Sequence, residues 1–436
     1  MSTKGSRSPR AFGALLGRAH GVLSRSSAKI EDMILRGLRA VQVVLLAAVV
    51  ALSMAAPSAA IPRPDVDPFY AAPADLADYP AGAITRSRPI ALLGLPLPVS
   101  AWQVQYRTND AGGTPTPGMA TMLVPQFPWL GPGDRPLLSY QVPEDSLGTQ
   151  CAPSYALRGG WELSGITTFI DTPFMADALR RGWALVVSDY QGPGSRFIDG
   201  VNSGHGVLDG IRAARAFAPG GVGPASPVGA YGYSGGAFAT LWAAQLQPGY
   251  APDVRFAGIA AGGVPADWPA IARGVDGGVQ AGLALLIVLS IARDHPGSGV
   301  ADLLNERGRT MLAEDGSACG SDLVLKYTDA RVDDFSIEPN LLSHPAFRAA
   351  TDAQELGASA PQAPAYLYHS TTDDVIPFAG FTALVERYCA LGADITYTYS
   401  TLPGHNPTAI VEWFGAMNYL GDRFAGVPVA AGCHAR

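Results

Sequence analysis

One five-residue stretch, Gly232-Tyr233-Ser234-Gly235-Gly236, constrains the fold of this chain more than any other. The apolar run before it, residues 227–231, predicts a short strand, and residues 237–247 after it predict a helix. A serine on so sharp a strand-to-helix turn has a strained backbone. The residues two before it and two after it must be small, or they would collide with the neighbouring elements, and both are glycines. The stretch therefore predicts a nucleophilic serine raised above a sheet, with a Gly/Ser-rich loop as the alternative.

Apolar runs and helical patterns alternate along most of the chain. The predicted strands are 101–107 and 119–124, which form a hairpin around the turn 110–118, then 137–140, 183–188, 227–231, 256–261, 365–369 and 395–400. The predicted helices are 174–181, 207–217, 237–247, 378–391 and 407–424. Because strands and helices alternate, we expect an α/β fold with a mostly parallel central sheet and helices on both faces.

Two stretches do not follow this alternation. Residues 61–95 are rich in Pro, Ala and Asp and predict an irregular N-terminal arm. Residues 263–350 carry helical patterns without a clear strand and predict an inserted helical cap over a core made of 96–262 and 351–436. The nearly apolar run Leu283 to Ala292 in this cap is too short to cross a bilayer. It is either a buried helix or the lining of an acyl-chain pocket.

The first 60 residues have the organisation of an export signal. Eight basic residues stand against two acidic ones in residues 1–39, an apolar run follows from Ala40 to Ala56, and a small-residue segment ends at Ala60. We expect a signal peptide that is cleaved after Ala60, and therefore a secreted or cell-envelope protein. The apolar run is only marginally long enough to span a bilayer, so an uncleaved membrane anchor is the alternative.

The charge of the chain without this leader excludes some partners. The whole chain has a net charge of −7, and removal of the leader with its excess of six positive charges leaves −13. An acidic surface argues against nucleic acid and against anionic headgroups as electrostatic partners. An acidic surface does not exclude neutral lipids as substrates. The sequence does not determine the oligomeric state.

Four cysteines, all after the leader, indicate disulfides: Cys151, Cys319, Cys389 and Cys433. An even number in an exported chain predicts two bridges, for which three pairings exist. None of the four lies in a C-x-x-C or His-rich setting. We therefore expect no metal site, and the chemistry predicted for the serine needs no cofactor.

A nucleophilic serine needs a base, and the base needs an orienting carboxylate. In an α/β-hydrolase fold these residues follow the serine in the order acid, then His, each just past the end of a strand. His405 lies between the last predicted strand and the last predicted helix and is the predicted base, whereas His369 ends an apolar strand and is interpreted as structural. Asp373 is the predicted acid because it lies nearer the end of the preceding strand than Asp374. We interpret Asp374 as the cap of the helix that begins near Phe378.

The negative oxygen formed during acyl transfer must meet preorganised donors. One predicted donor is the backbone N–H of Gly235, the residue after the nucleophile, and the second should come from the loop 142–146 after the third strand. That loop, Val142-Pro143-Glu144-Asp145-Ser146, carries no His-Gly-Gly-Gly run.

At these positions the chain resembles the secretory lipase family of the lipase A type, found in fungi and actinobacteria. The matching residues are Glu144-Asp145-Ser146, Cys151-Ala152-Pro153-Ser154-Tyr155, Asp189-Tyr190, Leu208 to Ala213, Gly232 to Gly236, Asp373 to Pro377 and Gly404-His405. The resemblance covers roughly residues 70 to 433.

The resemblance implies roles for particular residues and a helical cap over the site. It implies that Asp145 and Gly235 form the oxyanion hole. It also implies that Ser234, Asp373 and His405 form a catalytic triad. It implies two disulfides, Cys151–Cys319 and Cys389–Cys433. Because an ionised Asp145 would repel an oxyanion, we expect it to act either through its backbone N–H or through a protonated side chain in a poorly solvated pocket.

The sequence thus predicts a secreted serine carboxylic-ester hydrolase, and within this class a lipase that acts on acylglycerols and contacts lipid surfaces. An acyltransferase of the cell envelope and a short-chain esterase are enzymatic alternatives, because the same acyl-enzyme would serve all three. A non-catalytic lipid-binding envelope protein is the alternative from another class. A peptidase is disfavoured, because nothing marks a site for an amine.

Overall fold

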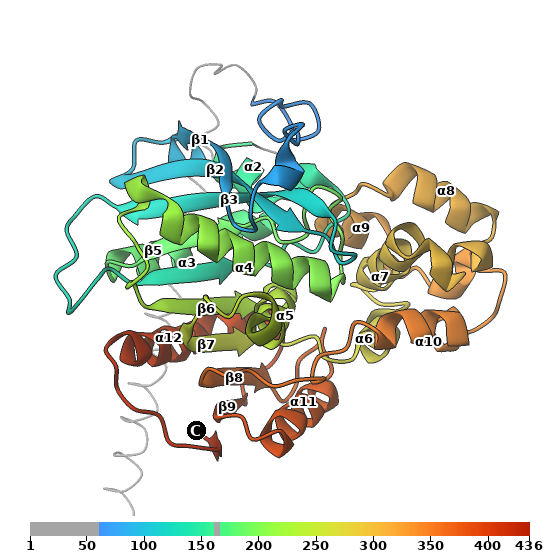
Figure 1. Cartoon of the computed structure of the whole chain (residues 1–436). Helices are drawn as coiled ribbons and strands as arrows, with labels where there is room; N and C mark the ends of the chain where they lie inside the picture. The colour runs from blue at the N-terminus through green and yellow to red at the C-terminus, as the bar shows by residue number, and fades with distance from the viewer. Residues whose placement is uncertain (1–60, 161–165) are drawn as a thin grey trace, which may run out of the picture. The chain divides into compact units, whose positions relative to one another are not determined.

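A single sheet dominates the part of the chain that the computed structural model describes, residues 61–160 and 166–436 (Figure 1). Its strand order is β1-β2-β3-β5-β4-β6-β7-β8-β9-β10. The strands are β1 Ile84–Ile90, β2 Val99–Asn109, β3 Pro115–Pro125, β4 Leu137–Gln141, β5 Ala184–Ser188, β6 Val228–Tyr233, β7 Phe256–Gly262, β8 Ala365–Ser370, β9 Ile395–Ser400 and β10 Cys433–Ala435. The pairs β1–β2, β2–β3 and β3–β5 are antiparallel. From β5 through β4 to β10 all pairs are parallel. The prediction of a mostly parallel sheet is therefore confirmed.

Helices cover both faces of this sheet. The helices are α2 Pro153–Leu157, α3 Ile166–Arg180, α4 Gly200–Ala216, α5 Gly235–Tyr250, α6 Trp268–Val275, α7 Ala281–Asp294, α8 Glu306–Asp315, α9 Gly320–Lys326, α10 Pro345–Asp352, α11 Phe378–Ala390 and α12 His405–Phe424. The apolar residues of α4, α5 and α11 pack against one face, with α4 and α5 in front in Figure 1, and those of α3 and α12 pack against the other. Strands β4 to β6 are buried along their whole length, as expected of strands covered on both sides.

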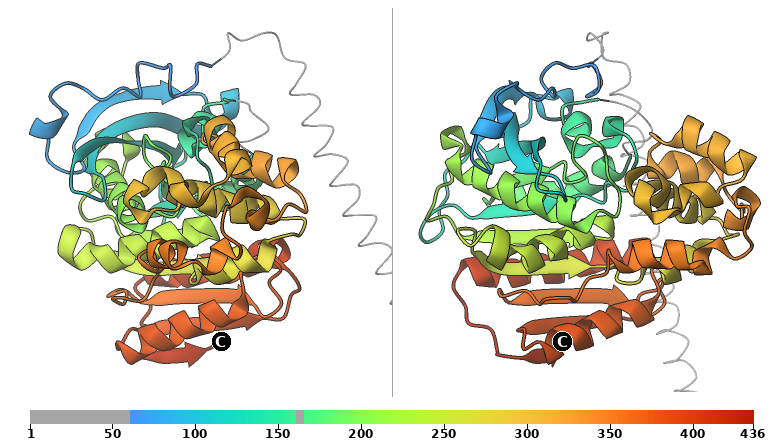
Figure 2. Two further views of the ribbon diagram at one scale, coloured as in Figure 1. Left: turned by 90° about the vertical axis from the view of Figure 1, so that its right-hand side faces the viewer. Right: turned by 45° about the vertical axis from the view of Figure 1, so that its right-hand side comes forward.

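The chain between β7 and β8 forms five α-helices, α6 to α10, which we call the helical insert. Figure 2 shows it beyond the ends of the central strands. The apolar run predicted at 283–292 lies within α7, where residues 284–292 are all buried. The boundaries of core and cap at 263 and 350 stay a proposal. Among the described residues no helix is both long and apolar enough to cross a membrane.

The structure corrects the sequence interpretation at the edges of the sheet. The stretch 61–95 was expected to be irregular but contains β1, which pairs with β2, and the short strand β10 at the C-terminus was missed. Edge strands are paired on one side only, and β1 has no fully buried residue, so it lacks the apolar run on which the prediction relied.

Two helices begin earlier than predicted. Helix α4 begins at Gly200 rather than near 207, because the side chain of Asp199 accepts the N–H of Asn202 and caps a first turn that is polar and glycine-rich. Helix α3 begins at Ile166 rather than at 174. The predicted signal peptide, residues 1–60, lies outside the described residues.

Candidate active site

The predicted nucleophile lies on a strained turn between β6 and α5. Ser234 has φ 54° and ψ −127°, a conformation that a residue with a side chain rarely adopts. Its N–H donates to Gly262 O at 3.0 Å. A Cβ on Gly232 would lie 2.1 Å from Gly236 O, and a Cβ on Gly236 would lie 2.1 Å from Gln141 O. Both glycines are therefore required by close backbone contacts, for the reason expected from the sequence.

The predicted acid and base are in direct contact. His405 Nδ1 lies 2.8 Å from Asp373 Oδ2, and Asp373 Oδ1 accepts the backbone N–H groups of Val375 at 2.9 Å and Ile376 at 2.8 Å. Burial opposes ionisation of Asp373, but the hydrogen bond from His405, the charge interaction with it and the backbone donor outweigh burial, and the pKa of Asp373 lies below its ordinary value. An ionised carboxylate that faces Nδ1 fixes the tautomer in which Nε2 is free to accept a proton.

Backbone contacts hold His405 at the first position of α12. Gly404, at φ 86°, makes the turn into this helix. Asp374 Oδ1 accepts the N–H of His405 at 2.8 Å, and Tyr233 donates its hydroxyl to His405 O at 2.7 Å. The interpretation of Asp374 as the cap of the helix near Phe378 is therefore wrong. Its side chain instead reaches the N-terminus of α12, which the fold brings next to the loop after β8.

Gly263 lies against His405 and follows Gly262, the residue that accepts the N–H of Ser234. A Cβ on Gly263, which has φ 54°, would lie 2.9 Å from His405 Cε1 and 2.7 Å from Tyr233 Cζ. Ser234 Oγ makes no hydrogen bond to another described residue. Catalytic hydrogen bonds are often long in ligand-free structures and tighten when substrate binds. The sequence analysis missed Tyr233 and Gly263. Tyr233 directly precedes the serine and Gly263 directly follows β7, and these positions could have marked both as site residues.

The predicted oxyanion loop contains a strained acid with one buried carboxyl oxygen. Asp145 has φ 32°, and its Oδ1 is buried without a hydrogen-bond partner among the described residues. The side chain lies over the start of α5, since a Cβ on Gly235 would lie 1.9 Å from Oδ1. Burial raises the pKa of Asp145 to about 6, although the charge interaction with His405 lowers it. A protonated carboxyl at this position can donate a hydrogen bond toward the serine.

Two more buried acids are Glu144, in the same loop, and Asp189, which lies next to it. Burial and the charge of Asp189 raise the pKa of Glu144, whose carboxyl oxygens have no hydrogen-bond partner among the described residues. Burial also raises the pKa of Asp189 to about 7, although Ser154 donates to it from its backbone N–H and its hydroxyl. Two carboxyls that repel each other in a dry site favour a state in which at least one of them is protonated.

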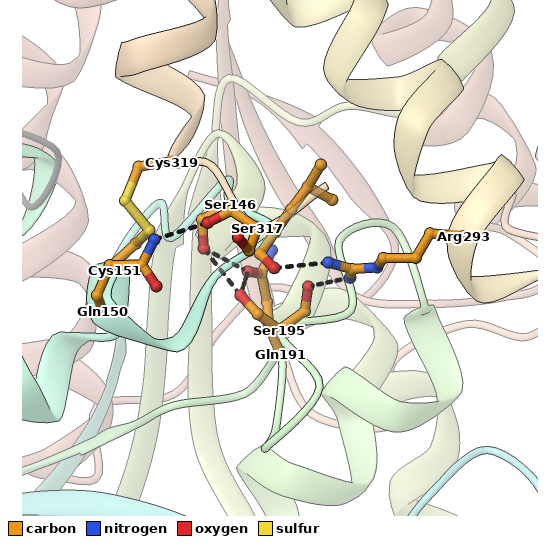
Figure 3. Close-up of a disulfide and its surroundings, with 9 residues drawn as sticks. Ser146, Gln150, Cys151, Gln191, Ser195, Arg293, Ser317 and Cys319 are labelled. Carbon is orange, nitrogen blue, oxygen red and sulfur yellow. Dashed lines mark hydrogen bonds between the residues drawn. A yellow bond between two sulfur atoms is a disulfide. The ribbon is translucent and has the colours of Figure 1, made fainter. Parts of the chain in front are cut away.

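A disulfide and an arginine hold the oxyanion loop to the helical insert (Figure 3). Cys151 is bonded to Cys319, which precedes α9, and Gly320 N–H donates to Asp145 O at 3.0 Å. Arg293, in α7, donates to Leu147 O at 2.5 Å and also to Ser195 O at 2.7 Å. The position of Asp145 is therefore set partly by the insert.

The second disulfide joins Cys389 at the end of α11 to Cys433 in β10. Both bridges are the pairs that the family resemblance implied. Neither pairing followed from the spacing of the cysteines alone.

A small apolar cavity lies over the serine. It is lined by Asp145, Ser234 and Gly235 of the predicted site together with Phe197, Pro265, Trp268, Ile271, Leu283, Ile287, Val375 and Ile376. Its volume is about 30 Å³, room for a few water molecules. An acyl chain would therefore require the side chains from α6 and α7 to move away from the serine.

Comparisons with known proteins identify the family and several relatives of this chain. The model of the secretory lipase family matches residues 157–432. The protein named probable inactive lipase MT1628, from Mycobacterium tuberculosis, is 34% identical over 84% of this chain and 83% of its own length. The secreted triacylglycerol lipase LIP3 of Malassezia restricta is 31% identical, over 85% of this chain and 81% of its own length.

A solved structure is similar over most of the chain. The crystal structure of Candida antarctica lipase A in its closed state superposes with a TM-score of 0.78 at 29% identity, over 86% of this chain and 89% of that one. The predicted α/β-hydrolase fold is confirmed by this similarity and by the sheet described above.

Proposed function

The chain belongs to the secretory lipase family, and on this premise we propose that it is a secreted serine hydrolase of carboxylic esters that acts on acylglycerols. The observation that carries the proposal is the contact between His405 and Asp373 beside a serine on a strained turn. The apolar cavity over Ser234 supports an acyl group as the part of the substrate that binds there.

The proposed reaction has two steps. In the first, Ser234 Oγ attacks the ester carbonyl, His405 Nε2 takes the serine proton and passes it to the leaving alcohol, and an acyl-enzyme forms. In the second, His405 removes a proton from water, the hydroxide attacks the acyl-enzyme, and the fatty acid leaves as the proton returns to Ser234. Asp373 stays ionised and stabilises the imidazolium in both steps.

The proposed oxyanion hole combines the N–H of Gly235 with Asp145. The unpartnered Oδ1 of Asp145 and its raised pKa favour a protonated side chain as the second donor. The loop 142–146 offers no glycine run whose backbone N–H groups could replace this side chain. We therefore assign the side chain, rather than the N–H of Asp145, to the developing oxyanion.

A serine-directed organophosphorus probe tests the proposal. We expect the protein to be labelled and the Ser234→Ala variant to remain unlabelled, with hydrolysis of p-nitrophenyl esters lost in parallel. A variant with an alanine at Ser226, a serine of the loop before β6, controls for unspecific labelling. Labelling that persists in Ser234→Ala would reject Ser234 as the nucleophile.

The relative named as a probable inactive lipase makes a non-catalytic lipid-binding protein the second candidate. Such a protein would bind acylglycerol vesicles and fail to react with the probe. A cell-envelope acyltransferase and a short-chain esterase would both be labelled. They are separated from a lipase by supplying an alcohol acceptor and by comparing short with long acyl chains in solution and in emulsion.

Contact with a lipid surface is part of the proposal. Ile410, Val411 and Phe414 on α12 are between 51% and 58% exposed, and the helix that carries them begins at His405. We expect Phe414→Ser to lower hydrolysis of emulsified triacylglycerol several-fold and to leave hydrolysis of a soluble ester unchanged. Leu130→Ser, at a side chain that is 90% exposed on the loop after β3, is the matched control.

Export is proposed together with this activity. The relative from Malassezia restricta is named a secreted lipase, and two disulfides are compatible with an oxidising compartment. N-terminal sequencing of the protein from culture medium tests both export and the predicted cleavage after Ala60. Nucleic acid, metals and cofactors play no part in the proposed reaction.

A further inference from the structure

A second histidine lies beside the predicted catalytic acid. His369 is in β8, its side chain is fully buried, and its Nε2 lies 3.5 Å from Asp373 Oδ2, the oxygen that also contacts His405. Sequence analysis assigned it a structural role because it ends an apolar strand. The fold places it next to the acid, where it approaches the same carboxyl oxygen as the base.

The surroundings of the ring determine its protonation. Both neighbours of Nε2 are acceptors, namely Ile376 O at 3.0 Å and Asp373 Oδ2, so Nε2 carries the proton and donates. Nδ1 is buried without a hydrogen-bond partner among the described residues. Burial lowers the pKa of His369, in agreement with a neutral ring.

Aromatic side chains hold the ring in this orientation. His369 stacks on Phe381 of α11, with ring centroids 4.8 Å apart and an angle of 23° between the planes. Phe378, also on α11, and Tyr399 of β9 close the cluster. The ring therefore has little freedom to turn its N–H away from the loop after β8.

Ile376 links this ring to the rest of the site. Its N–H donates to Asp373 Oδ1, its carbonyl accepts from His369, and its side chain lines the cavity over Ser234. We propose that His369 is a positioning residue for the catalytic acid: its N–H fixes the turn 373–376, which in turn orients the Asp373 carboxylate toward His405. The inference rests on the proposed function, because it gives Asp373 the role of acid.

The charges around His369 agree with this role. Asp373 faces it from the loop after β8, and His405 acts on it from α12. The described neighbours on α11 are uncharged rings, and Tyr399 is the titratable neighbour on β9. A neutral donor at this point supports the ionised acid without adding a second positive charge beside the base.

Two substitutions separate a positioning role from a packing role. His369→Gln keeps an N–H near the position of Nε2, and His369→Leu fills the space without a donor. For His369→Leu we expect kcat on a soluble ester to fall about 10- to 100-fold with KM nearly unchanged, because a displaced catalytic group costs rate rather than binding. We expect His369→Gln to recover most of this loss.

A readout independent of turnover is the low-field proton resonance of the His405–Asp373 hydrogen bond, assigned by its absence in Asp373→Asn. We expect it to shift or broaden in His369→Leu and to be retained in His369→Gln. The matched control is His434→Leu, because His434 Nε2 also contacts a carbonyl, that of Ala431, but at the exposed C-terminus.

Both variants are first compared by thermal unfolding, so that only folded protein is assayed. If folded His369→Leu keeps the wild-type kcat and resonance, or if His369→Gln loses as much rate as His369→Leu, the inference is overturned. Failure of the proposed function would appear elsewhere, as activity and probe labelling that survive Ser234→Ala.

Discussion

The two halves of the candidate site differ in how their acids are satisfied. On the triad side, Asp373 accepts two backbone N–H groups and the ring of His405, and its pKa is lowered. On the oxyanion side, Asp145 and Glu144 have buried carboxyl oxygens without partners, and their pKa values are raised. One half is therefore built around an ionised carboxylate, and the other around carboxyls whose ionisation is disfavoured. Substitution and pH should affect the two halves in different ways.

The largest effect should come from the triad side. We expect Asp373→Asn to lower kcat/KM about 10³- to 10⁴-fold, because the amide cannot stabilise the imidazolium and favours the wrong tautomer of His405. Asp374→Asn is the matched control, since it keeps an oxygen for the N–H of His405. Steady-state kinetics on a soluble ester measure both. A greater loss in Asp374→Asn would exchange the roles assigned to the two acids.

On the oxyanion side, two substitutions of Asp145 separate the contribution of its side-chain volume from that of its hydrogen-bond donor. We expect Asp145→Leu to lower kcat about 10²- to 10³-fold, the usual effect of losing one oxyanion donor, and Asp145→Asn to stay within about tenfold of the wild type. Burst and steady-state kinetics give kcat for each variant. Unchanged activity in Asp145→Leu would remove the side chain from the mechanism and leave only the backbone N–H.

The pH dependence should come from the oxyanion side. If protonated Asp145 is the donor, kcat should fall by up to about tenfold per pH unit above about 6, the pKa that burial gives this carboxyl. The fall should be absent in Asp145→Asn, which does not titrate. A profile measured from pH 4 to 9 on a soluble ester tests this, and an identical decline in both proteins would assign the titration to another group.

The pH dependence of the unfolding free energy should also reflect the titration of Asp145. The folded pKa of Asp145, about 6, exceeds its ordinary value of 3.8, so the folded chain holds a proton that the unfolded chain has already released. Stability therefore falls as pH rises from about 4 to about 6. Urea unfolding should show Asp145→Asn about 3 kcal/mol more stable than the wild type at pH 7, with no gain at pH 4.

The smallest expected effect on kcat distinguishes the two disulfides. Removing either pair by alanine substitution should cost about 2–5 kcal/mol of unfolding free energy. Only loss of Cys151–Cys319 should also lower kcat, by a few-fold, because that bridge holds the insert against the loop of Asp145. Loss of Cys389–Cys433 should leave kcat unchanged in protein that remains folded. Equal effects on kcat would show that the insert does not position Asp145.

The sequence predicted best the features that depend on neighbouring residues. The turn around Ser234 needs small residues two positions away on both sides, so five residues are enough to identify it. The buried strands were found because continuous apolar runs mark strands covered on both faces. Strand β1 was missed because an edge strand carries no such run, and Asp374 was assigned to the wrong helix because its partner, His405, lies 31 residues away.

By itself, the sequence determined the order of the central strands and helices and the serine turn, and it predicted His405 as the base, because each depends on periodicity or on spacing along the chain. Only the tertiary structure decided the contact of Asp373 with His405, the placement of His369 beside that acid, and the raised pKa of Asp145. These depend on which groups are buried together and how far water is excluded from them, and burial of that kind arises only when distant segments pack.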